Sequence, residues 1–176
     1  SITLSALSAS SDRHIDGSPT LNGSASFLYA LTVGAVLIAV ETTTNSVFTT
    51  DASTGSGVGF PIPLANGGND DVYFSTSDGV RKRVFDRTNK TFSAGWDNTA
   101  ISSPSAPIFV PPPGTLYLYV GSSDGKLHKL DPANGTDLLR RTLNASATVG
   151  EPSFDTSSNK LYAGASDGRI YSFDLF

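Results

Sequence analysis

The chain has 176 residues and a formal net charge of −4 at pH 7, a length that suits one domain with a sizeable core. It contains no cysteine, which excludes disulfides, thiolate metal sites and cysteine nucleophiles, and its mild acidity argues against nucleic acid as a partner. Charged residues make up only 16%, while Gly and Pro number 17 and 10, a composition typical of short strands joined by turns.

The N-terminal part contains the longest apolar stretch of the chain. The sequence starts at Ser1 and has no methionine, which favours a mature secreted protein whose leader has been removed. His14 lies in the polar run Ser11–Asp16, which is more typical of a solvated loop than of a metal site. The apolar stretch Phe27–Val40 has 14 residues, fewer than the roughly 20 that cross a bilayer. We therefore expect no membrane insertion, and two buried strands around the turn Val33–Ala35.

A motif of the form Leu-Tyr-x-Gly-x-Ser-Asp-Gly, followed by a short strand and an aspartate, recurs along the chain. Its clearest copies are Leu118–Asp131 and Leu161–Asp174, and Val72–Asp86 is a third copy with one extra residue. Ile38–Asp51 is predicted to be a fourth, worn copy, in which Asn45 stands at the turn glycine. The closing aspartates then lie 35, 45 and 43 residues apart, a period typical of propeller blades.

The three clear copies carry an Asp-Gly pair where a hairpin is expected. Asp-Gly is a preferred pair for a two-residue type I′ turn, because both central residues need a positive φ. We assign these residues to structural turns, since recurrence at one place per unit is what turn formation predicts. The pairs are Asp78 with Gly79, Asp124 with Gly125, and Asp167 with Gly168.

The repeat predicts an all-β fold, namely a β-propeller of four blades or a four-blade part of a larger propeller. Each unit is expected to contain four strands, of which the second and third are joined by the Asp-Gly turn. The last unit reaches Phe176 without a fourth strand, and Ile2–Ala6 resembles Arg141–Ala145, the fourth strand of the preceding unit. We expect Ile2–Ala6 to close the last blade and hide its edge. The single domain 1–176 then consists of units 17–58, 59–101, 102–149, and 150–176 with 1–7.

The segment Leu116–Phe176 contains the motifs Leu-Tyr-Val-Gly-Ser-Ser-Asp-Gly-Lys-Leu, Leu-Asp-Pro-Ala-Asn-Gly and Leu-Tyr-Ala-Gly-Ala-Ser-Asp-Gly-Arg-Ile. They resemble the quinoprotein-like propeller repeats, a family that includes pyrroloquinoline-quinone dehydrogenases and the propeller lipoprotein of outer-membrane assembly. The family's docking tryptophan follows the Asp-x-x-x-Gly turn. Here Leu139 stands at that place in the third unit, and Trp96 lies about two positions from it in the second.

The resemblance also bears on chemistry. Enzymes of this family have about eight blades and a vicinal cysteine pair, whereas this chain has four units and no cysteine. It therefore implies a propeller fold in a non-enzymatic member, and we assign no catalytic, cofactor-binding or metal-binding residue.

Basic residues are concentrated in the second unit. Five of the twelve Lys and Arg side chains lie within ten positions. A solvated face is the commoner meaning of such a cluster, and an electrostatic contact with an acidic partner is its functional interpretation. The five residues are Arg81, Lys82, Arg83, Arg87 and Lys90.

The remaining candidates are a histidine and four glycosylation sequons. His128 lies mid-strand, where other units carry Tyr171 and Phe48, so we expect it to pack in the structure. Asn66–Asp71 offers oxygen ligands but lacks the spacing of a calcium loop, and we expect an ordinary loop there. Four Asn-x-Ser/Thr patterns fall in predicted loops or strand ends, as candidate glycosylation sites. Their asparagines are Asn22, Asn89, Asn134 and Asn144.

These features together predict a non-catalytic extracellular scaffold or adhesion module that binds a protein or glycan partner. One alternative is a subunit or decoration of a cell-surface filament such as a pilus, formed by self-assembly. Completion of the propeller by another chain is also open. A further alternative is a fragment of a quinone-dependent dehydrogenase, which reconstitution with pyrroloquinoline quinone and calcium would reveal.

Overall fold

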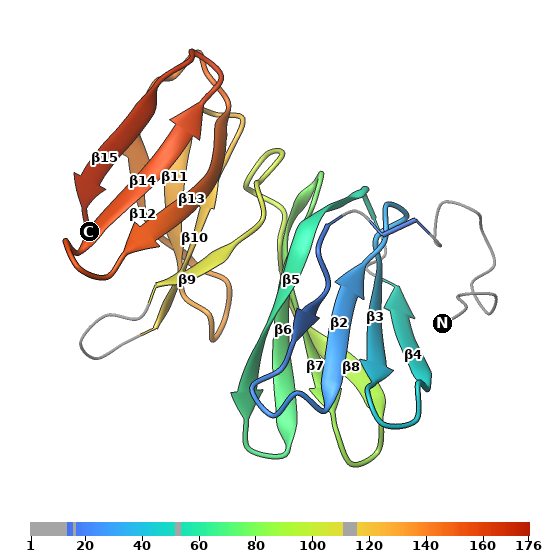
Figure 1. The fold of residues 1–176 in the computed structure, drawn as a ribbon. Helices are drawn as coiled ribbons and strands as arrows, with labels where there is room; N and C mark the ends of the chain where they lie inside the picture. The colour runs from blue at the N-terminus through green and yellow to red at the C-terminus, as the bar shows by residue number, and fades with distance from the viewer. Residues whose placement is uncertain (1–13, 16, 52–53, 111–115) are drawn as a thin grey trace.

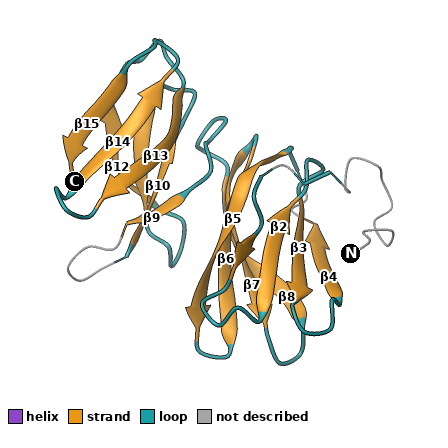
Figure 2. Ribbon diagram, viewed as in Figure 1, coloured by secondary structure: helices purple, strands orange, loops and turns teal. Residues whose placement is uncertain are grey.

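The computed structural model describes residues 14–15, 17–51, 54–110 and 116–176. These residues form strands, turns and loops (Figure 2), and the all-β prediction is confirmed. The strands assemble into four antiparallel sheets, each built from consecutive strands of the chain (Figure 1). Among the described residues, no helix is long and apolar enough to cross a membrane.

Each sheet is one blade of the propeller, and the family resemblance to propeller repeats is confirmed at the level of fold. Blade 1 consists of β1 (Thr20–Leu21), β2 (Phe27–Leu31), β3 (Val36–Glu41) and β4 (Val47–Asp51). Blade 2 consists of β5 (Gly57–Asn66), β6 (Asn69–Thr76), β7 (Gly79–Asp86) and β8 (Thr91–Asn98). Blade 3 consists of β9 (Ile108–Val110), β10 (Tyr117–Gly121), β11 (Lys126–Leu130) and β12 (Asp137–Thr142). Blade 4 consists of β13 (Val149–Asp155), β14 (Lys160–Ala165) and β15 (Ile170–Asp174).

Blade 1 shows that the predicted alignment of the worn repeat is wrong by one strand. β2 and β3 form the central hairpin, so the counterpart of Asp131 is Glu41 and not Asp51. Asn45 has a φ of 60°, and its backbone N–H donates to the Glu41 carbonyl at 2.8 Å. Gly135, with a φ of 76°, makes the same bond to Asp131. Asn45 therefore belongs to the turn after the third strand.

The corrected alignment also makes the repeat more regular. With Glu41 as the first closing acid, the intervals become 45, 45 and 43 residues. The two buried strands predicted around Val33–Ala35 are confirmed as β2 and β3. Their place in the repeat was missed because Gly34 and Ala35 stand where the other units have Asp-Gly. Ala35 nevertheless takes a φ of 61°, at the place where Gly125 has 79°. The backbone of the turn is thus kept although its sequence marker is lost.

The expectation of type I′ hairpins is wrong as well. Gly125 has a positive φ, but Asp124 does not. Gly125 donates its amide to the Ser122 carbonyl at 3.3 Å, the pattern of a type I turn followed by a left-handed glycine. Asp78 and Asp167 also lack a positive φ. The aspartates therefore need no left-handed backbone, and only the following glycine does in blades 3 and 4.

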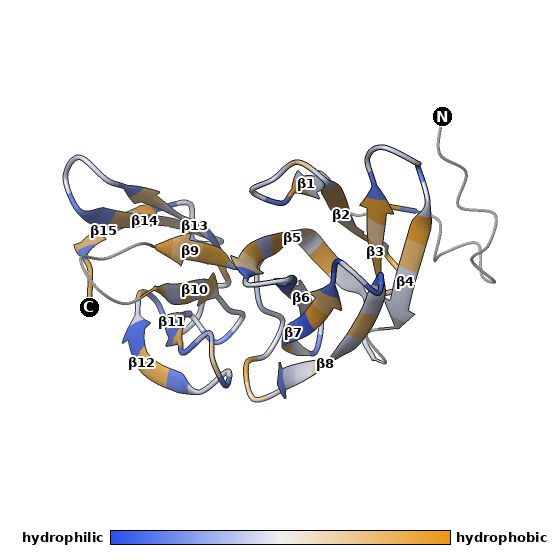
Figure 3. Ribbon diagram, turned by 90° about the horizontal axis from the view of Figure 1, so that it is seen from below, coloured by the Kyte–Doolittle hydropathy of each residue, from blue (hydrophilic) through white to orange (hydrophobic). Residues whose placement is uncertain are grey.

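Successive blades pack against one another through apolar clusters. Tyr29 and Phe85 lie in the cluster between blades 1 and 2, and Tyr73 and Leu118 in that between blades 2 and 3. Tyr119 belongs to a third cluster, between blades 3 and 4. Figure 3 shows the apolar strands along this line of contacts. Each fully buried side chain of this size contributes about 1.5–3 kcal/mol, so the blades stabilise one another.

The described blades form an open arc. Figures 1 and 3 place blades 1 and 4 at opposite ends of the molecule. Within the described residues, blade 4 has three strands, and Ile170 on its outer face is 79% exposed. The segment Ile2–Ala6, predicted to be the fourth strand of this blade, lies outside the described residues. Closure of the last blade by that segment stays a prediction.

Candidate interaction site between the second and third blades

Blade 3 docks on blade 2 through the turn that follows β11. The indole Nε1 of Trp96 donates to the Pro132 carbonyl at 3.0 Å, and the Tyr73 hydroxyl donates to the same oxygen at 3.2 Å. The side-chain amide of Asn98 donates to the Gly135 carbonyl at 2.8 Å. A Cβ on Gly135 would overlap the Trp96 ring, so this turn requires glycine for its contact as well as for its φ.

Trp96 is therefore a docking tryptophan of the kind that the family resemblance implies. The register of the β7–β8 pair shifts between Arg81 and Arg83, beside Trp96, which lies about two positions from its expected place. Leu139, at the expected place in the third unit, is 51% exposed and does not take this role.

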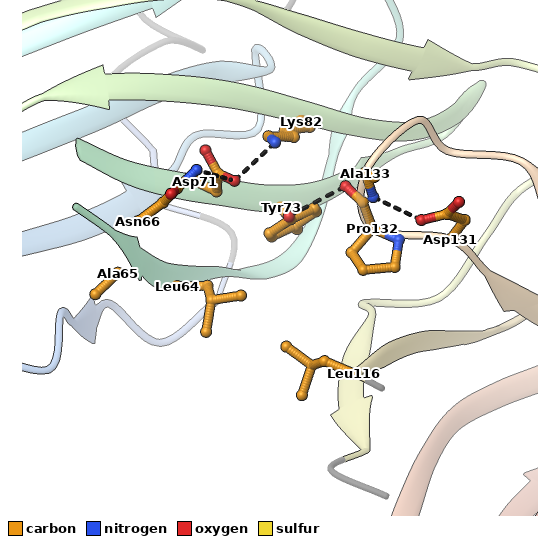
Figure 4. A pocket seen from close by; sticks show the side chains of 10 residues that line it. All are labelled: Leu64, Ala65, Asn66, Asp71, Tyr73, Lys82, Leu116, Asp131, Pro132 and Ala133. Carbon is orange, nitrogen blue, oxygen red and sulfur yellow. Dashed lines mark hydrogen bonds and ion pairs between the residues drawn. The ribbon is translucent and has the colours of Figure 1, made fainter. Parts of the chain in front are cut away.

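A cleft of about 590 Å³ opens beside this docking contact, between blades 2 and 3 (Figure 4). Its blade 2 wall comes from β5, β6 and β7, and its blade 3 wall from the start of β10 and the turn after β11. Apolar side chains and three charged side chains line it. The lining residues are Leu64, Ala65, Asn66, Asp71, Tyr73 and Lys82 of blade 2, and Leu116, Asp131, Pro132 and Ala133 of blade 3.

Asp71 and Lys82 form an ion pair in the wall of the cleft. Lys82 Nζ lies 2.7 Å from Asp71 Oδ2, and the Asn66 side-chain amide also donates to that oxygen, at 3.3 Å. Asp71 is 6% exposed, and its second oxygen, Oδ1, is buried with no hydrogen-bond donor among the described residues. The pair is therefore electrically neutral but incompletely hydrogen-bonded.

Tyr73 links the ion pair to the docking turn. Burial raises the pKa of its hydroxyl above the usual value, and the charges of Asp71 and Asp131 raise it further. The hydroxyl thus stays protonated and donates to the Pro132 carbonyl, the docking carbonyl of this interface. Its ring packs edge-on against Phe109, with centroids 5.0 Å apart, and Lys82 Nζ lies 5.6 Å from its centre.

Asp131 contributes the third charge of the cleft. Its Oδ1 accepts the Ala133 amide at 2.8 Å, which shapes the docking turn. Among the described residues Asp131 has no ion-pair partner. Because Asp71 is neutralised by Lys82, the cleft carries one uncompensated negative charge.

The basic cluster of the second unit is largely turned inward. Arg81 is 2% exposed and binds Asp78 at 2.8 Å and Asp97 at 3.0 Å. Arg83 shares the Asp97 carboxylate at 2.6 Å. Lys82 is half-buried and paired with Asp71. The interpretation as a solvated face is thus wrong for Arg81, Lys82 and Arg83, whose charges are neutralised by carboxylates of neighbouring strands.

The other two members of the cluster are half-buried and also paired. Arg87 Nη1 lies 3.5 Å from Asp70 Oδ1, and Lys90 Nζ lies 2.9 Å from Glu41. Both pairs involve the interface between blades 1 and 2. A contact with an acidic partner stays a prediction for Arg87 and Lys90 alone.

The recurrent turn aspartates each accept a hydrogen bond from a side chain of the following strand. Arg81 donates to Asp78 at 2.8 Å, and the Tyr171 hydroxyl donates to Asp167 at 2.6 Å. Asp124 lies 3.2 Å from the Nε2 of a third such side chain, His128. These bonds tie each hairpin to its own blade and agree with a structural role.

His128 is 2% exposed and lies between two carboxylates. Its Nδ1 is 2.8 Å from Asp137 Oδ2, and Arg140 Nε donates to the same oxygen at 2.7 Å. Both imidazole nitrogens are thus engaged within blade 3, as the expected packing role requires. Within the described residues, no group of three or more His, Cys, Asp or Glu side chains is arranged to hold a metal ion.

The four sequons differ in how available their side-chain nitrogens are. Asn22 is buried and its Nδ2 donates to Asp70 at 2.8 Å, so the prediction of a glycosylation site is wrong there. The Nδ2 atoms of Asn89 and Asn144 donate to Asp86 and Asp167. Glycosylation at these two positions and at the exposed Asn134 stays a prediction.

Most of this site was missed from the sequence. The basic cluster included Lys82, but Asp71, the carboxylate that neutralises Lys82, lies on a different strand. Tyr73 and Pro132 belong to the repeat itself, and their placement one blade apart was the available signal: the same motif supplies the tyrosine of one blade and the turn of the next.

Comparison with known proteins agrees with the fold. A family model described as outer membrane protein assembly factor BamB matches residues 5–176. A search of curated proteins finds no match.

Among solved structures, BamB from Moraxella catarrhalis is similar with a TM-score of 0.66 and 19% identity, over 91% of this chain and 46% of that one. The computationally designed Ika4 protein is similar with a TM-score of 0.64 and 16% identity, over 91% of this chain and 92% of that one. The designed Ika8 protein has a TM-score of 0.61 and 14% identity, over 85% of this chain and 43% of that one. At these identities the likeness concerns the fold, and this chain spans about half the length of the BamB structure.

Proposed function

This chain belongs to the outer membrane protein assembly factor BamB family, and we propose that it is a non-catalytic β-propeller module that binds a protein partner. The family description supports a place at or beyond the outer membrane, and the extracellular placement predicted from the sequence is kept as part of the proposal. Since the chain spans about half of the BamB structure that it matches, no partner of BamB is carried over to it.

The cleft between blades 2 and 3 is the observation that carries the proposal. It lies beside the rigid docking contact of Trp96 and Tyr73 with Pro132, so its walls are held in place before a partner arrives. Preorganised walls lower the entropic cost of binding. A concave apolar surface with a few fixed polar groups is the usual form of a recognition site.

The non-catalytic part of the proposal is supported by how the titratable groups are used. His128 is enclosed by Asp124 and Asp137 within one blade. The Asp70 carboxylate is held by Tyr29 and Asn22 between blades 1 and 2. General acid–base chemistry needs such groups within reach of a substrate, and these side chains are instead committed to the packing of blades.

Photo-crosslinking in the native cells tests the binding role. Benzoylphenylalanine placed at Ala65, an exposed residue on the rim of the cleft, is expected to crosslink to one discrete protein band that mass spectrometry can identify. The same probe at the exposed Thr156, in the β13–β14 turn, is the control and should give no such band. Equal labelling at both positions, or none at Ala65, would contradict a partner at the cleft.

A separate assay tests the absence of catalysis. The purified chain is mixed with pyrroloquinoline quinone and calcium, and dye-linked oxidation of alcohols and sugars is followed. We expect no rate above that of the cofactor alone. A protein-dependent rate that saturates with substrate would make the chain part of a quinone-dependent dehydrogenase.

A further inference from the structure

The cleft lies at one of two related blade interfaces whose docking turns differ. Between blades 3 and 4, the Tyr119 hydroxyl and Lys129 Nζ both donate to the Phe176 carbonyl, at 3.0 and 2.6 Å. The Phe176 ring packs edge-on against Tyr119, with centroids 5.6 Å apart. By these contacts Phe176 corresponds to Pro132, whose carbonyl accepts from Tyr73. One interface thus places a phenylalanine ring against its tyrosine, whereas the other has the Pro132–Ala133 turn beside an open cleft.

The polar groups around this open space are mainly hydrogen-bond acceptors. Tyr73 uses its proton on the docking carbonyl, which leaves its oxygen able to accept. The Asn66 amide nitrogen donates to Asp71, and its carbonyl oxygen accepts no described donor. Asp131 has no ion-pair partner within the part of the chain that the structure describes. A ligand that brings several N–H donors and a positive charge complements these groups, because unpaired acceptors and a lone carboxylate both gain from it.

The walls of the cleft set the shape of the ligand. Leu64 and Leu116 face it from the two blades, together with Pro132 and Ala133 of the docking turn. These apolar surfaces suit an aliphatic stem, while the charged end needs to reach the acceptors at the rim. Arginine combines a three-carbon stem with a planar, five-donor cation.

We propose that this cleft takes an arginine side chain of a partner polypeptide, with its stem on Leu64, Leu116 and Pro132 and its guanidinium at Asp131. The inference rests on the proposed function and deepens it by naming the chemical group that the partner contributes. Arginine is favoured over a purely apolar side chain because the cleft carries an uncompensated negative charge.

NMR titration of the ¹⁵N-labelled chain with two short peptides tests this directly. The probes are acetyl-Leu-Arg-Leu-amide and its citrulline analogue, which has nearly the same shape but no charge. We expect saturable shifts of the Ala133 and Lys82 amides with the arginine peptide, and binding about fivefold weaker with the citrulline peptide, as for the loss of one exposed ion pair. Added salt should narrow that difference.

Three variants test whether the charge of Asp131, and not the fold of the docking turn, sets the preference for the arginine peptide. Asp131→Asn can still accept the Ala133 amide and should lose the preference for arginine over citrulline. Asp86→Asn changes the equivalent turn of blade 2, where Oδ1 accepts the Thr88 amide, and should keep the preference. Ala133→Phe adds an aromatic ring to the lining of the cleft and should block both peptides. Dispersed amide spectra establish that each variant is folded.

The peptide titrations and the crosslinking experiment can fail independently of each other. No saturable shift near the cleft up to about 10 mM peptide, equal affinity for both peptides, or an undiminished arginine preference in Asp131→Asn overturns the inference. If the crosslink at Ala65 is nevertheless found, the proposed function stands and only its chemistry is wrong. If the arginine preference is found without any crosslink, the cleft binds arginine but the proposed function fails.

Discussion

The carboxylate of Asp70 in blade 2 accepts two hydrogen bonds from side chains of blade 1, across the interface between the two blades. The Tyr29 hydroxyl donates to it at 2.7 Å and Asn22 at 2.8 Å. We expect Tyr29→Phe to lower the free energy of unfolding by about 1.5–3 kcal/mol, because a buried charged acceptor loses a donor. Tyr162→Phe is the control, since that hydroxyl bonds to no described residue, and should change it by less than about 0.5 kcal/mol. Urea unfolding measures both, and equal losses would contradict the assignment.

The turn aspartates make stability depend on pH. Burial alone would raise the pKa of Asp124, but hydrogen bonds from Lys126 and His128 outweigh it and lower the pKa to about 2. The pKa of Asp78 is lowered to about 2 in the same way, by Thr54, Thr76 and Arg81. The unfolded value is about 3.9, so this stabilisation is complete above about pH 5 and is lost as the pH falls toward 2.

The corresponding experiment is urea unfolding between about pH 5 and pH 2. The unfolding midpoint of the wild type should fall over this range, and Asp124→Asn should show a shallower fall because the titrating group is gone. Parallel pH profiles for the two proteins would show that Asp124 contributes nothing to the acid sensitivity.

At the scale of strands and turns, three of the four units could be predicted from the Asp-Gly marker and its closing aspartate. In the first unit the apolar stretch predicted the central hairpin, but its alignment with the repeat failed, because Gly34 and Ala35 replace that marker while Ala35 still adopts the left-handed backbone. The true repeat there is carried by Leu28 and Tyr29, which correspond to Leu118 and Tyr119. A sequence pattern tied to a single turn fails when the fold tolerates another residue in that turn.

The docking turn of blade 3 gives a test at this scale. Gly135→Ala should destabilise the protein clearly more than Gly168→Ala, although both glycines have nearly the same φ, 76° and 80°. The added Cβ meets the Trp96 ring in the first case and open space in the second. Backbone strain alone costs about 1–2 kcal/mol, and the excess in Gly135→Ala measures the docking contact. Equal melting temperatures for the two variants would show that Trp96 yields without cost.

In the whole molecule, the charges of the second unit could not be assigned from the sequence. Arg81 and Arg83 meet Asp97 only because β7 and β8 pair in a particular register, with a bulge between them. The cleft was equally hidden, since its walls come from two blades and from the turn that docks one blade on the other. Both features follow from how blades meet, which a repeat pattern alone does not specify.

The N-terminal segment is a further prediction at this scale. If Ile2–Ala6 completes blade 4, deleting residues 1–7 removes a ladder of backbone hydrogen bonds, each worth about 1 kcal/mol, and the burial of Ile2 and Leu4, at about 1.5–3 kcal/mol each. Against a total stability of about 5–15 kcal/mol, the loss should be disabling. A deletion variant that melts within a few degrees of the parent and stays soluble would show that the segment does not close this blade.

The claim that the cleft between blades 2 and 3 receives a protein partner is tested most directly by filling it. Benzoylphenylalanine at Ala65 reports the partner in native cells, and the measurement compares its crosslinking yield in the wild type and in Ala133→Phe. We expect the crosslinked band to disappear in the variant while its unfolding midpoint stays close to that of the wild type, because Ala133 is exposed and lines the cleft. An unchanged yield in the folded variant would contradict the account.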